Sequence, residues 1–356
     1  MRPFSPSFAL FAALSLAPLS FAPLTAQELV AGKPAPALSI AKWVKGDAVT
    51  ELKKDHVYVV EFWATWCGPC IAGMPHLSEV QKHHKGAVTV IGVTSEDESN
   101  KLADVEAMVK EKGDTMAYTV AWDDAGKTQK AWFEAAGQEG IPCCFVVDKT
   151  GTVAWIGHPM WLDVILPDVL AGKVDVKALA GKPAAVELRL QRVFLAAQVN
   201  PQKAIEEAEA LCKEYPFLAT QVDMGLLSFF AAADDPSLAW PVGERAFTRA
   251  VASKDANVLN GIAWTIVDPE GSCKKPNLEL AMKAAAKAVE LTTRKDPSIL
   301  DTLARVHACK GEWDLAISVQ KEAVALIPEE AAEAKEQYEG TLKEYEAKAK
   351  AKAAGK

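Results

Sequence analysis

Residues 63–70 have the sequence WATWCGPC, and this stretch decides the fold. It follows the apolar run 57–62 (VYVVEF), which predicts a buried strand, and its last three residues begin the segment 68–84, which predicts a helix. Two cysteines separated by two residues on a first helical turn lie close enough to form a disulfide. The stretch therefore predicts a strand, a turn and a helix that carry a redox-active pair, Cys67 and Cys70.

The two cysteines have different predicted roles. Cys67 falls at the start of the helix, where unpaired backbone N–H groups and the helix dipole stabilise a thiolate. A thiolate attacks a disulfide to form a mixed disulfide, which Cys70 would then resolve. A zinc site also uses this spacing but needs a second ligand pair. The chain has no second C-x-x-C, and the adjacent Cys143 and Cys144 would point to opposite faces of a strand. We therefore expect no metal and no cofactor.

Strands and helices alternate on both sides of this motif, from residue 27 to about 172. The expected strands are 57–62, 87–94, 116–121, 144–148 and 152–156, and the expected helices are 68–84, 101–112, 128–136 and 161–170. The last two strands flank the turn 148–151 (DKTG), which favours a hairpin. The pattern predicts an α/β domain at 27–175, with a mixed central sheet and helices on both faces.

The strands stop beyond about residue 183. Helices are expected at 184–197, 201–214, 217–232 and 238–252. Residues 258–264 then align with 299–305, and residues 280–283 align with 315–318, which indicates a repeated helix pair. We expect an all-α helical-repeat domain at 176–328. The segment 329–356 is rich in Ala, Glu and Lys and predicts a charged C-terminal helix that frays into a solvated tail.

The first domain resembles the thioredoxin superfamily, and within it the exported TlpA/ResA-like branch, over roughly residues 30–172. The motifs that carry the resemblance are WCGPC at 66–70, Ile141-Pro142 before a strand, Pro75, residues 31–36 (AGKPAP) and residues 146–151. The resemblance implies a thiol–disulfide oxidoreductase. It also implies a cis peptide bond before Pro142, which packs against the disulfide and, with Ile141, docks the substrate strand. Trp66, Gly68 and Pro69 would support the active site.

Glu61 is a third candidate catalytic residue. It lies six residues before Cys67, where thioredoxins carry a buried acid that relays protons to the resolving thiol. Burial in a strand would raise the pKa of its carboxyl group, which could then deprotonate Cys70. The family's partner lysine is missing, since residues 88–93 contain none. The alternative is that Glu61 faces solvent at the end of the strand.

The helical repeats resemble tetratricopeptide repeats. The second copy keeps the family's spacing at Leu300, Leu303, Ala304, Ala316, Ala323 and Pro328. His307 and Gln320 stand where larger aromatic residues are usual, so the match is partial. The resemblance implies either a concave surface that binds a protein partner or a structural or dimerising appendage.

The remaining cysteines suggest two further expectations. Cys273 and Cys309 should lie on one edge of a stack of helix pairs, so a structural disulfide could join them in an exported protein. The alternative is two unrelated thiols. Cys143 follows the proposed cis proline, and its side chain either lies near the active disulfide or packs as a small residue under the sheet.

The first 26 residues predict a signal peptide, with Arg2, an apolar run and a small-residue site at 25–26. We expect a periplasmic or otherwise extracytoplasmic protein; if the segment stayed uncleaved, it would anchor the chain to a membrane. The formal net charge of −8, without a basic cluster, argues against a nucleic-acid partner.

The sequence therefore predicts an extracytoplasmic enzyme for dithiol–disulfide exchange on protein substrates, supplied by an upstream redox donor. Gly68-Pro69 matches reducing thioredoxins, which favours a reductase, although the direction depends on how well the thiolate is stabilised. The alternative from another class is a helical-repeat adaptor or scaffold with a regulatory redox domain. A thiol peroxidase is disfavoured, because its reactive cysteine sits in a different motif.

Overall fold

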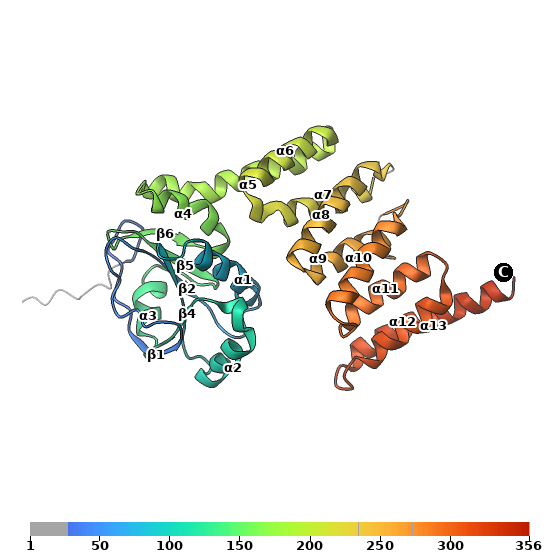
Figure 1. The fold of residues 1–356 in the computed structure, drawn as a ribbon, viewed down its shortest axis with the longest axis horizontal. Helices are drawn as coiled ribbons and strands as arrows, with labels where there is room; N and C mark the ends of the chain where they lie inside the picture. The colour runs from blue at the N-terminus through green and yellow to red at the C-terminus, as the bar shows by residue number, and fades with distance from the viewer. Residues whose placement is uncertain (1–27, 234, 272, 356) are drawn as a thin grey trace, which may run out of the picture. The chain divides into compact units, whose positions relative to one another are not determined.

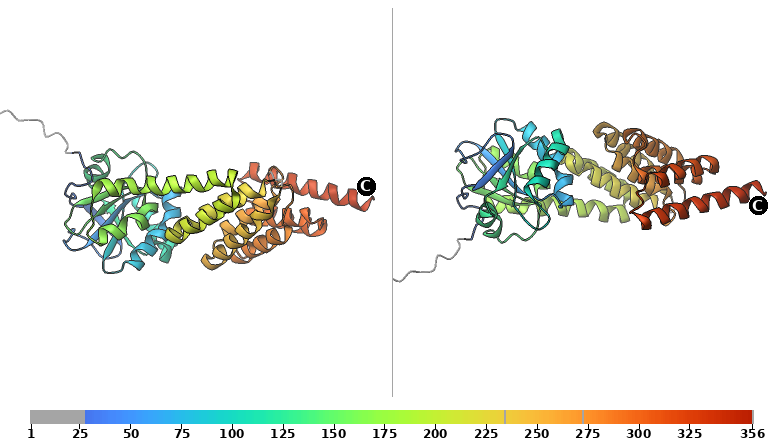
Figure 2. Two further views of the ribbon diagram at one scale, coloured as in Figure 1. Left: turned by 90° about the horizontal axis from the view of Figure 1, so that it is seen from above. Right: turned by 90° about the horizontal axis from the view of Figure 1, so that it is seen from below.

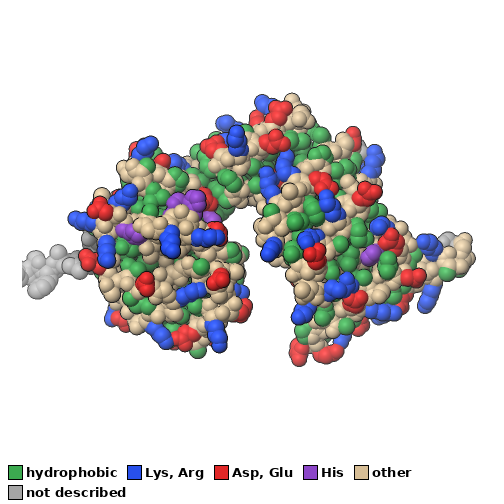
Figure 3. Space-filling view, in the orientation of Figure 1, with side chains coloured by type: hydrophobic (Ala, Val, Ile, Leu, Met, Phe, Trp, Pro, Cys, Tyr) green, Lys and Arg blue, Asp and Glu red, His purple; other side chains and the backbone are tan. Residues whose placement is uncertain are grey.

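The computed structural model describes residues 28–233, 235–271 and 273–355, so the predicted signal peptide at 1–26 lies outside the described residues. The chain divides into two compact units (Figure 1). The first comprises Met1–Met160 with Asp168–Val176, and the second Trp161–Pro167 with Lys177–Lys356. Lys and Arg side chains are interspersed with Asp and Glu over the visible surface of each unit (Figure 3).

The first unit is built on a six-stranded mixed sheet in the order β1-β4-β3-β2-β5-β6. The strands are β1 (Ile40–Lys45), β2 (Val57–Phe62), β3 (Val88–Thr94), β4 (Thr119–Asp123), β5 (Cys143–Val147) and β6 (Val153–Gly157). β2, β3 and β4 run parallel, whereas β1, β5 and β6 each pair antiparallel to their neighbours. The mixed sheet that the sequence predicted is confirmed.

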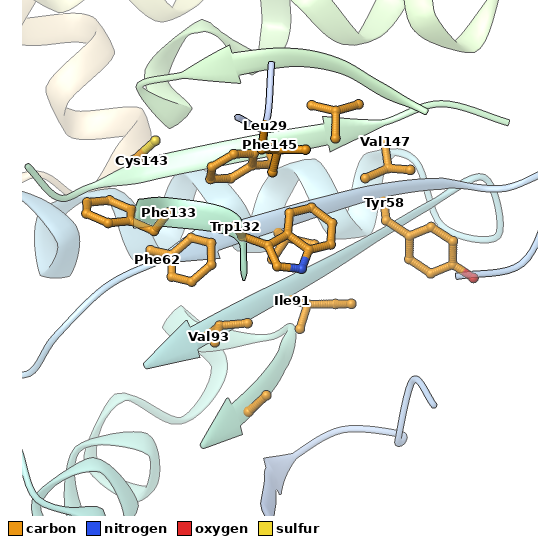
Figure 4. Close-up of a cluster of buried hydrophobic side chains, with 13 residues drawn as sticks. Leu29, Tyr58, Phe62, Ile91, Val93, Trp132, Phe133, Cys143, Phe145 and Val147 are labelled. Carbon is orange, nitrogen blue, oxygen red and sulfur yellow. The ribbon is translucent and has the colours of Figure 1, made fainter. Parts of the chain in front are cut away.

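β2 lies near the centre of the sheet, and every one of its residues is buried. Its side chains alternate between the two faces, as in any strand. Tyr58, Val60 and Phe62 join one apolar cluster, which Trp132 and Phe133 cover from the segment after β4 (Figure 4). Val57, Val59 and Glu61 therefore point to the opposite face, so β2 delivers one carboxyl group into an otherwise apolar layer.

Helices cover both faces of the sheet (Figure 1). They are α1 (Gly68–His83), α2 (Leu102–Lys112), η1 (Gly113–Met116), α3 (Lys127–Gln129) and η2 (Lys130–Glu134). η3 (Pro159–Trp161) and α4 (Leu162–Leu170) follow β6 and are divided between the two units. α1 begins directly after β2 and buries Met74, Leu77 and Val80. The side chain of Gln81 on α1 forms two hydrogen bonds to the backbone of β3. It accepts from the Val90 N–H at 2.8 Å and donates to the Val88 carbonyl at 3.2 Å.

The structure differs from the expected elements at three places. β1, which was not expected, is a partly exposed edge strand with two irregularities in its register. The strand expected at 116–121 begins at Thr119, because residues 113–116 form a 3₁₀ turn. The helix expected at 128–136 is a short α-helical turn followed by a π-helical turn at Lys130–Glu134. The hairpin turn at 148–151 is present, and Gly151 adopts a φ of +84° there.

The second unit is helical throughout its regular structure. Its elements are α5 (Val176–Val199), α6 (Pro201–Glu214), η4 (Pro216–Leu218), α7 (Ala219–Ala231), η5 (Pro236–Leu238), α8 (Ala239–Ser253), α9 (Ala256–Val267), α10 (Leu278–Leu291), α11 (Pro297–Cys309), α12 (Trp313–Ala325) and α13 (Ala332–Ala353). Each helix from α7 to α13 packs against the next one along the chain (Figure 2). α5 starts eight residues earlier than expected and contains Pro183 in its interior.

Buried charge pairs and helix caps hold this unit together. Asp223 on α7 is fully buried and accepts hydrogen bonds from Arg245, at 2.6 and 2.9 Å, and from Arg249, both on α8. Leaving a buried carboxylate without its cation is costly, so these pairs fix α7 against α8. Asp296 caps α11 by accepting from the backbone N–H groups of Ser298 and Ile299. Within the described residues, no helix combines the length and the apolar character needed to cross a bilayer.

The expected disulfide between Cys273 and Cys309 is wrong. Both residues are described, and both are free thiols. Cys309 is the last residue of α11. Burial raises the pKa of its thiol, and the charges of Arg305 and of Lys348 on α13 oppose this effect. The Cys309 thiol is exposed, whereas Cys273 is partly buried. Cys273 lies in the connection between α9 and α10, the pair that precedes α11. A shared edge of the stack was therefore not sufficient to bring the two thiols together.

Candidate active site

The predicted redox pair lies at the junction of β2 and α1. Cys67 and Cys70 are joined by a disulfide, with their Cα atoms 5.2 Å apart. Cys67 is the N-cap of α1, and its sulfur accepts the backbone N–H of Cys70 at 3.2 Å. Pro69 occupies the first turn, where a missing N–H costs no helical hydrogen bond. The sequence thus places Cys67, and not Cys70, against the positive end of the helix.

Ile141 and Pro142 come to the same end of the sheet from a distant part of the chain. Their peptide bond is cis, as the resemblance implied. β5 begins at the next residue, and its Cys143 and Cys144 pair with Phe62 and Glu61 at the end of β2. This register brings the Ile141-Pro142 loop beside the start of the WCGPC motif. The strand pairing therefore assembles the two landmarks that sequence reasoning had identified separately.

A buried asparagine that sequence reasoning missed holds the loop in front of the disulfide. Asn100 is fully buried, and its Oδ1 accepts from the backbone N–H and the hydroxyl of Thr65 at 2.9 and 2.8 Å. Its Nδ2 donates to the Thr94 hydroxyl and to the Ser95 carbonyl. Asn100 therefore links the end of β3 to the residues that precede Cys67. No pattern in the sequence marks it, because its partners are distant in the chain.

Trp66 precedes the first cysteine and stands at the surface. Its side chain is 56% exposed, yet its Nε1–H donates to Asp97 Oδ2 at 2.8 Å. The second oxygen of that carboxylate accepts the backbone N–H of Ser99 at 2.7 Å. The hydrogen bond thus restrains the indole of the residue next to Cys67, while more than half of Trp66 stays exposed to solvent.

Glu61 is buried on the sheet face opposite the cluster of Phe62. Only 1% of the residue is exposed, which excludes the alternative of a carboxyl group facing solvent. Burial raises the pKa of the Glu61 carboxyl to about 8, and its Oε2 has no hydrogen-bond partner. The carboxyl group is therefore mostly protonated at neutral pH. Its ladder neighbours are Gly92 on β3 and Cys144 on β5.

Gly92 shows how the protein accommodates Glu61 without the family's lysine. A Cβ atom at Gly92 would stand 3.0 Å from Tyr118 Cε2 and 3.1 Å from Trp63 Nε1. The space beside Glu61 is therefore filled by two aromatic rings, and the indole nitrogen of Trp63 is itself buried without a partner. Burial and the charge of Glu61 both raise the pKa of the Tyr118 hydroxyl. Gly92, the residue of β3 that pairs with Glu61, has no side chain to place against the carboxyl group.

The two cysteines after Pro142 are buried on opposite faces. Cys143 joins the cluster of Phe62 and Phe133, and its thiol donates to Gln138 Oε1 at 3.5 Å (Figure 4). Burial, and secondarily the charge of Glu61, raises the pKa of the Cys143 thiol to about 12. Burial likewise raises the pKa of the Cys144 thiol. The geometry agrees with a small residue packed under the sheet, and both thiols stay protonated at neutral pH.

A cavity of about 410 Å³ opens beside the motif, on the side of Trp66 and Ile141. Its lining combines the ends of β2 and β3, the loop after β3, the η2 region and the loop before Pro142. The lining residues are Phe62, Trp63, Ala64, Trp66, Val93, Ser95, Asp97, Gln129, Phe133, Glu139, Gly140 and Ile141. Among the described residues, no group of three or more His, Cys, Asp or Glu side chains is arranged to hold a metal ion.

A disulfide at the start of a helix, after a central strand and beside a cis X-Pro loop, defines a thioredoxin-type thiol–disulfide oxidoreductase. Comparisons with known proteins agree. The Redoxin family model matches residues 30–159. Protein FixW of Rhizobium leguminosarum is 31% identical over 155 residues, which cover 41% of this chain and 69% of FixW. The thiol:disulfide interchange protein HelX of Rhodobacter capsulatus is 30% identical over 153 residues, 41% of this chain and 80% of HelX.

Among solved structures, a thiol-disulfide isomerase from Corynebacterium glutamicum aligns over 39% of this chain and 97% of its own, with a TM-score of 0.35 and 22% identity. The relatives place the chain in a family: it belongs to the TlpA/ResA-like thiol–disulfide oxidoreductases, and the resemblance inferred from the motifs is confirmed. The matched family model ends at residue 159, so it covers no part of α5–α13.

Proposed function

We propose that this protein is an extracytoplasmic reductase of disulfides in polypeptide substrates, and that Cys67 is its nucleophile. The observation that carries the proposal is the cap of α1, where the Cys67 sulfur accepts the Cys70 N–H. The same hydrogen bond and the helix dipole favour negative charge on that sulfur when the disulfide is reduced. Cys70 lies one turn into the helix and lacks this environment.

The reaction begins with both cysteines reduced. The Cys67 thiolate attacks one sulfur of a substrate disulfide, forms a mixed disulfide and releases the other substrate sulfur as a thiolate. Cys70 then loses its proton and attacks the Cys67 sulfur, which releases the second substrate thiolate. The enzyme is left with the Cys67–Cys70 disulfide, the form that the structure describes. An upstream dithiol donor returns it to the reduced form.

In its ionised form, the minority species at neutral pH, Glu61 is the proposed acceptor of the Cys70 proton. Its carboxyl group lies on a buried sheet face, and a pKa of about 8 is close to that of an ordinary thiol. A group with that pKa exchanges a proton with a thiol at little cost in free energy, which suits general acid–base catalysis. Trp63, Gly92 and Tyr118 keep the carboxyl group in an uncharged setting. A neighbouring lysine would lower the pKa of the carboxyl group, whereas burial beside these aromatic rings keeps it raised.

Substrate docking is assigned to the rim around the disulfide. Extended substrate backbone would pair with Ile141 beside the cis Pro142, as an added strand pairs with a sheet edge. Trp66 would cover the approaching chain from the other side. Gly68 and Pro69 are both exposed, whereas Cys67 is only 4% exposed, so the substrate would approach over these two residues. These residues provide backbone recognition that suits many polypeptides.

The cellular setting and the role of the helical unit complete the proposal. Export by the segment 1–26 would place the enzyme where protein disulfides persist. We propose a thioredoxin-like domain at 27–175, a tetratricopeptide-like domain at 176–328 and a charged helix or tail at 329–356. The stacked helices α7–α13 support a role in binding a protein partner.

Trapping tests the proposed function directly. A Cys70→Ser variant should accumulate its substrate as a mixed disulfide on Cys67, because nothing resolves the intermediate. A Cys67→Ser variant should trap nothing and should not reduce insulin disulfides. If the parental protein binds partners through its helical unit yet turns over no disulfide, the adaptor interpretation replaces this one.

A further inference from the structure

The cavity beside Trp66 has an apolar floor. Phe62, Val93 and Phe133 line it, and all three belong to the buried cluster on one face of the sheet (Figure 4). Apolar surface that a ligand covers is favourable to remove from water. Phe62 and Val93 are almost fully buried, so Ile141 and Trp66 supply the apolar surface that a substrate side chain can cover.

One wall of the cavity is a tryptophan held in a fixed orientation. The hydrogen bond from Trp66 Nε1 to Asp97 sets the plane of the ring, and 56% of the side chain remains exposed. An open indole face attracts a cation placed over it, and arginine stacks on such a face particularly well. Because this hydrogen bond already restrains the ring, a ligand that stacks on it causes little further loss of side-chain entropy at Trp66.

The rim of the cavity is acidic. Asp97 and Glu139 line it, and none of the lining residues is Lys, Arg or His. Glu139 is exposed and has no hydrogen bond or ion pair within the described parts of the chain. The two lysines of the neighbouring segment do not neutralise these carboxylates. Lys127 pairs with Asp124, and Lys130 does not line the cavity. The local charge therefore favours a cation and opposes an acid.

We infer that this cavity, which we call the acidic pocket, binds a long cationic side chain of the substrate, arginine or lysine, close in sequence to the reacting cysteine. The inference rests on the proposed function, because the pocket is lined by Trp66 and Ile141, the residues that precede Cys67 and Pro142 in the chain. The aliphatic stem would pack against Ile141, and the charged end would reach Trp66 and Glu139. A volume of about 410 Å³ is ample for such a side chain.

The test uses disulfide-linked peptides that differ at one position beside the cysteine, with arginine, leucine or glutamate there. The reduced protein should reduce the arginine peptide roughly five times faster than the leucine peptide in kcat/KM, and the glutamate peptide more slowly still. Added salt should narrow the difference, because exposed charges are screened. A neutral small disulfide, hydroxyethyl disulfide, reports on the chemistry without the pocket.

Variants then assign the preference to the pocket. Glu139→Gln and Asp97→Asn together should lower the ratio of the arginine rate to the leucine rate towards one. Glu134→Gln removes an exposed acid of η2 that does not line the pocket, and should leave the ratio unchanged. Equal rates for the arginine and leucine peptides in the parental protein would overturn the inference, as would a ratio that persists in the double variant. Loss of turnover with every disulfide, hydroxyethyl disulfide included, would instead overturn the proposed function itself.

Discussion

The buried carboxyl group of Glu61 should make the stability of the first unit depend on pH, and Glu61→Gln should remove that dependence. The folded protein holds the Glu61 pKa at about 8, because burial penalises the charged form, whereas the ordinary value is 4.5. Between these two values the folded state keeps a proton that the unfolded state has lost. The contribution of Glu61 to the free energy of unfolding is therefore greatest below pH 4.5 and falls as the pH rises through about 8.

The size of the effect follows from the same two values. At about 1.4 kcal/mol for each pH unit, the interval from 4.5 to about 8 corresponds to roughly 5 kcal/mol of lost stability. A typical domain has only about 5–15 kcal/mol in total, so the effect is large. Glutamine fills the same space without a charge. The variant and the parental protein should thus be similar at pH 4, and the variant should be clearly more stable at pH 8 and above.

Urea unfolding at a series of pH values measures this difference. The protein is kept oxidised, so that the Cys67–Cys70 disulfide removes both active-site thiols from the titration. Glu98→Gln, at an exposed position, serves as the control and should follow the parental curve. Parallel curves for the Glu61→Gln variant and the parental protein from pH 4 to 9 would refute the reasoning. They would show that Glu61 is either solvated or charged in the fold.

Three further predictions follow from the packing around the site. Gly92→Ala should destabilise the first unit by about 1–3 kcal/mol, measured by urea unfolding, because the new methyl group meets Tyr118 and Trp63 at 3.0–3.1 Å; an unchanged midpoint would contradict this contact. Asn100→Ala should cost about 2 kcal/mol and lower the rate of insulin reduction, because the Thr65 N–H loses its buried partner; full activity and stability would count against the tether. Cys143→Ala should leave the redox potential of the active disulfide unchanged in a glutathione titration, because the thiol packs into the apolar cluster, and a shifted potential would show contact with the disulfide.

The sequence was most informative where one short stretch determines local structure. The apolar run before Cys67 and the C-x-x-C spacing predicted β2, the turn and α1 correctly, because all three depend on neighbours in the chain. The family resemblance implied a buried acid at Glu61, and the residue is buried. The family resemblance supplied the cis peptide bond before Pro142, which no propensity could have indicated.

The features that the sequence did not predict depend on residues brought together by the fold. Asn100 reaches Thr65 across 35 residues, and the Trp63–Gly92–Tyr118 contact joins three separate segments. The pairing of Cys273 with Cys309 failed for a related reason. Repeat spacing predicts which helices are neighbours, but it does not predict in which direction the side chain of a single residue points. Partner choice for a single cysteine cannot be derived from spacing alone.

The central claim is that Cys67 is the attacking thiol, and the rate of alkylation of the reduced protein tests it most directly. The fully reduced protein is exposed briefly to iodoacetamide at pH 7, and the modified peptides are quantified by mass spectrometry. The position of Cys67 at the cap of α1, with its sulfur facing the Cys70 N–H, predicts that Cys67 is labelled well before Cys70. Faster labelling of Cys70 would contradict the account, because the helix cap would then not be what activates the thiol.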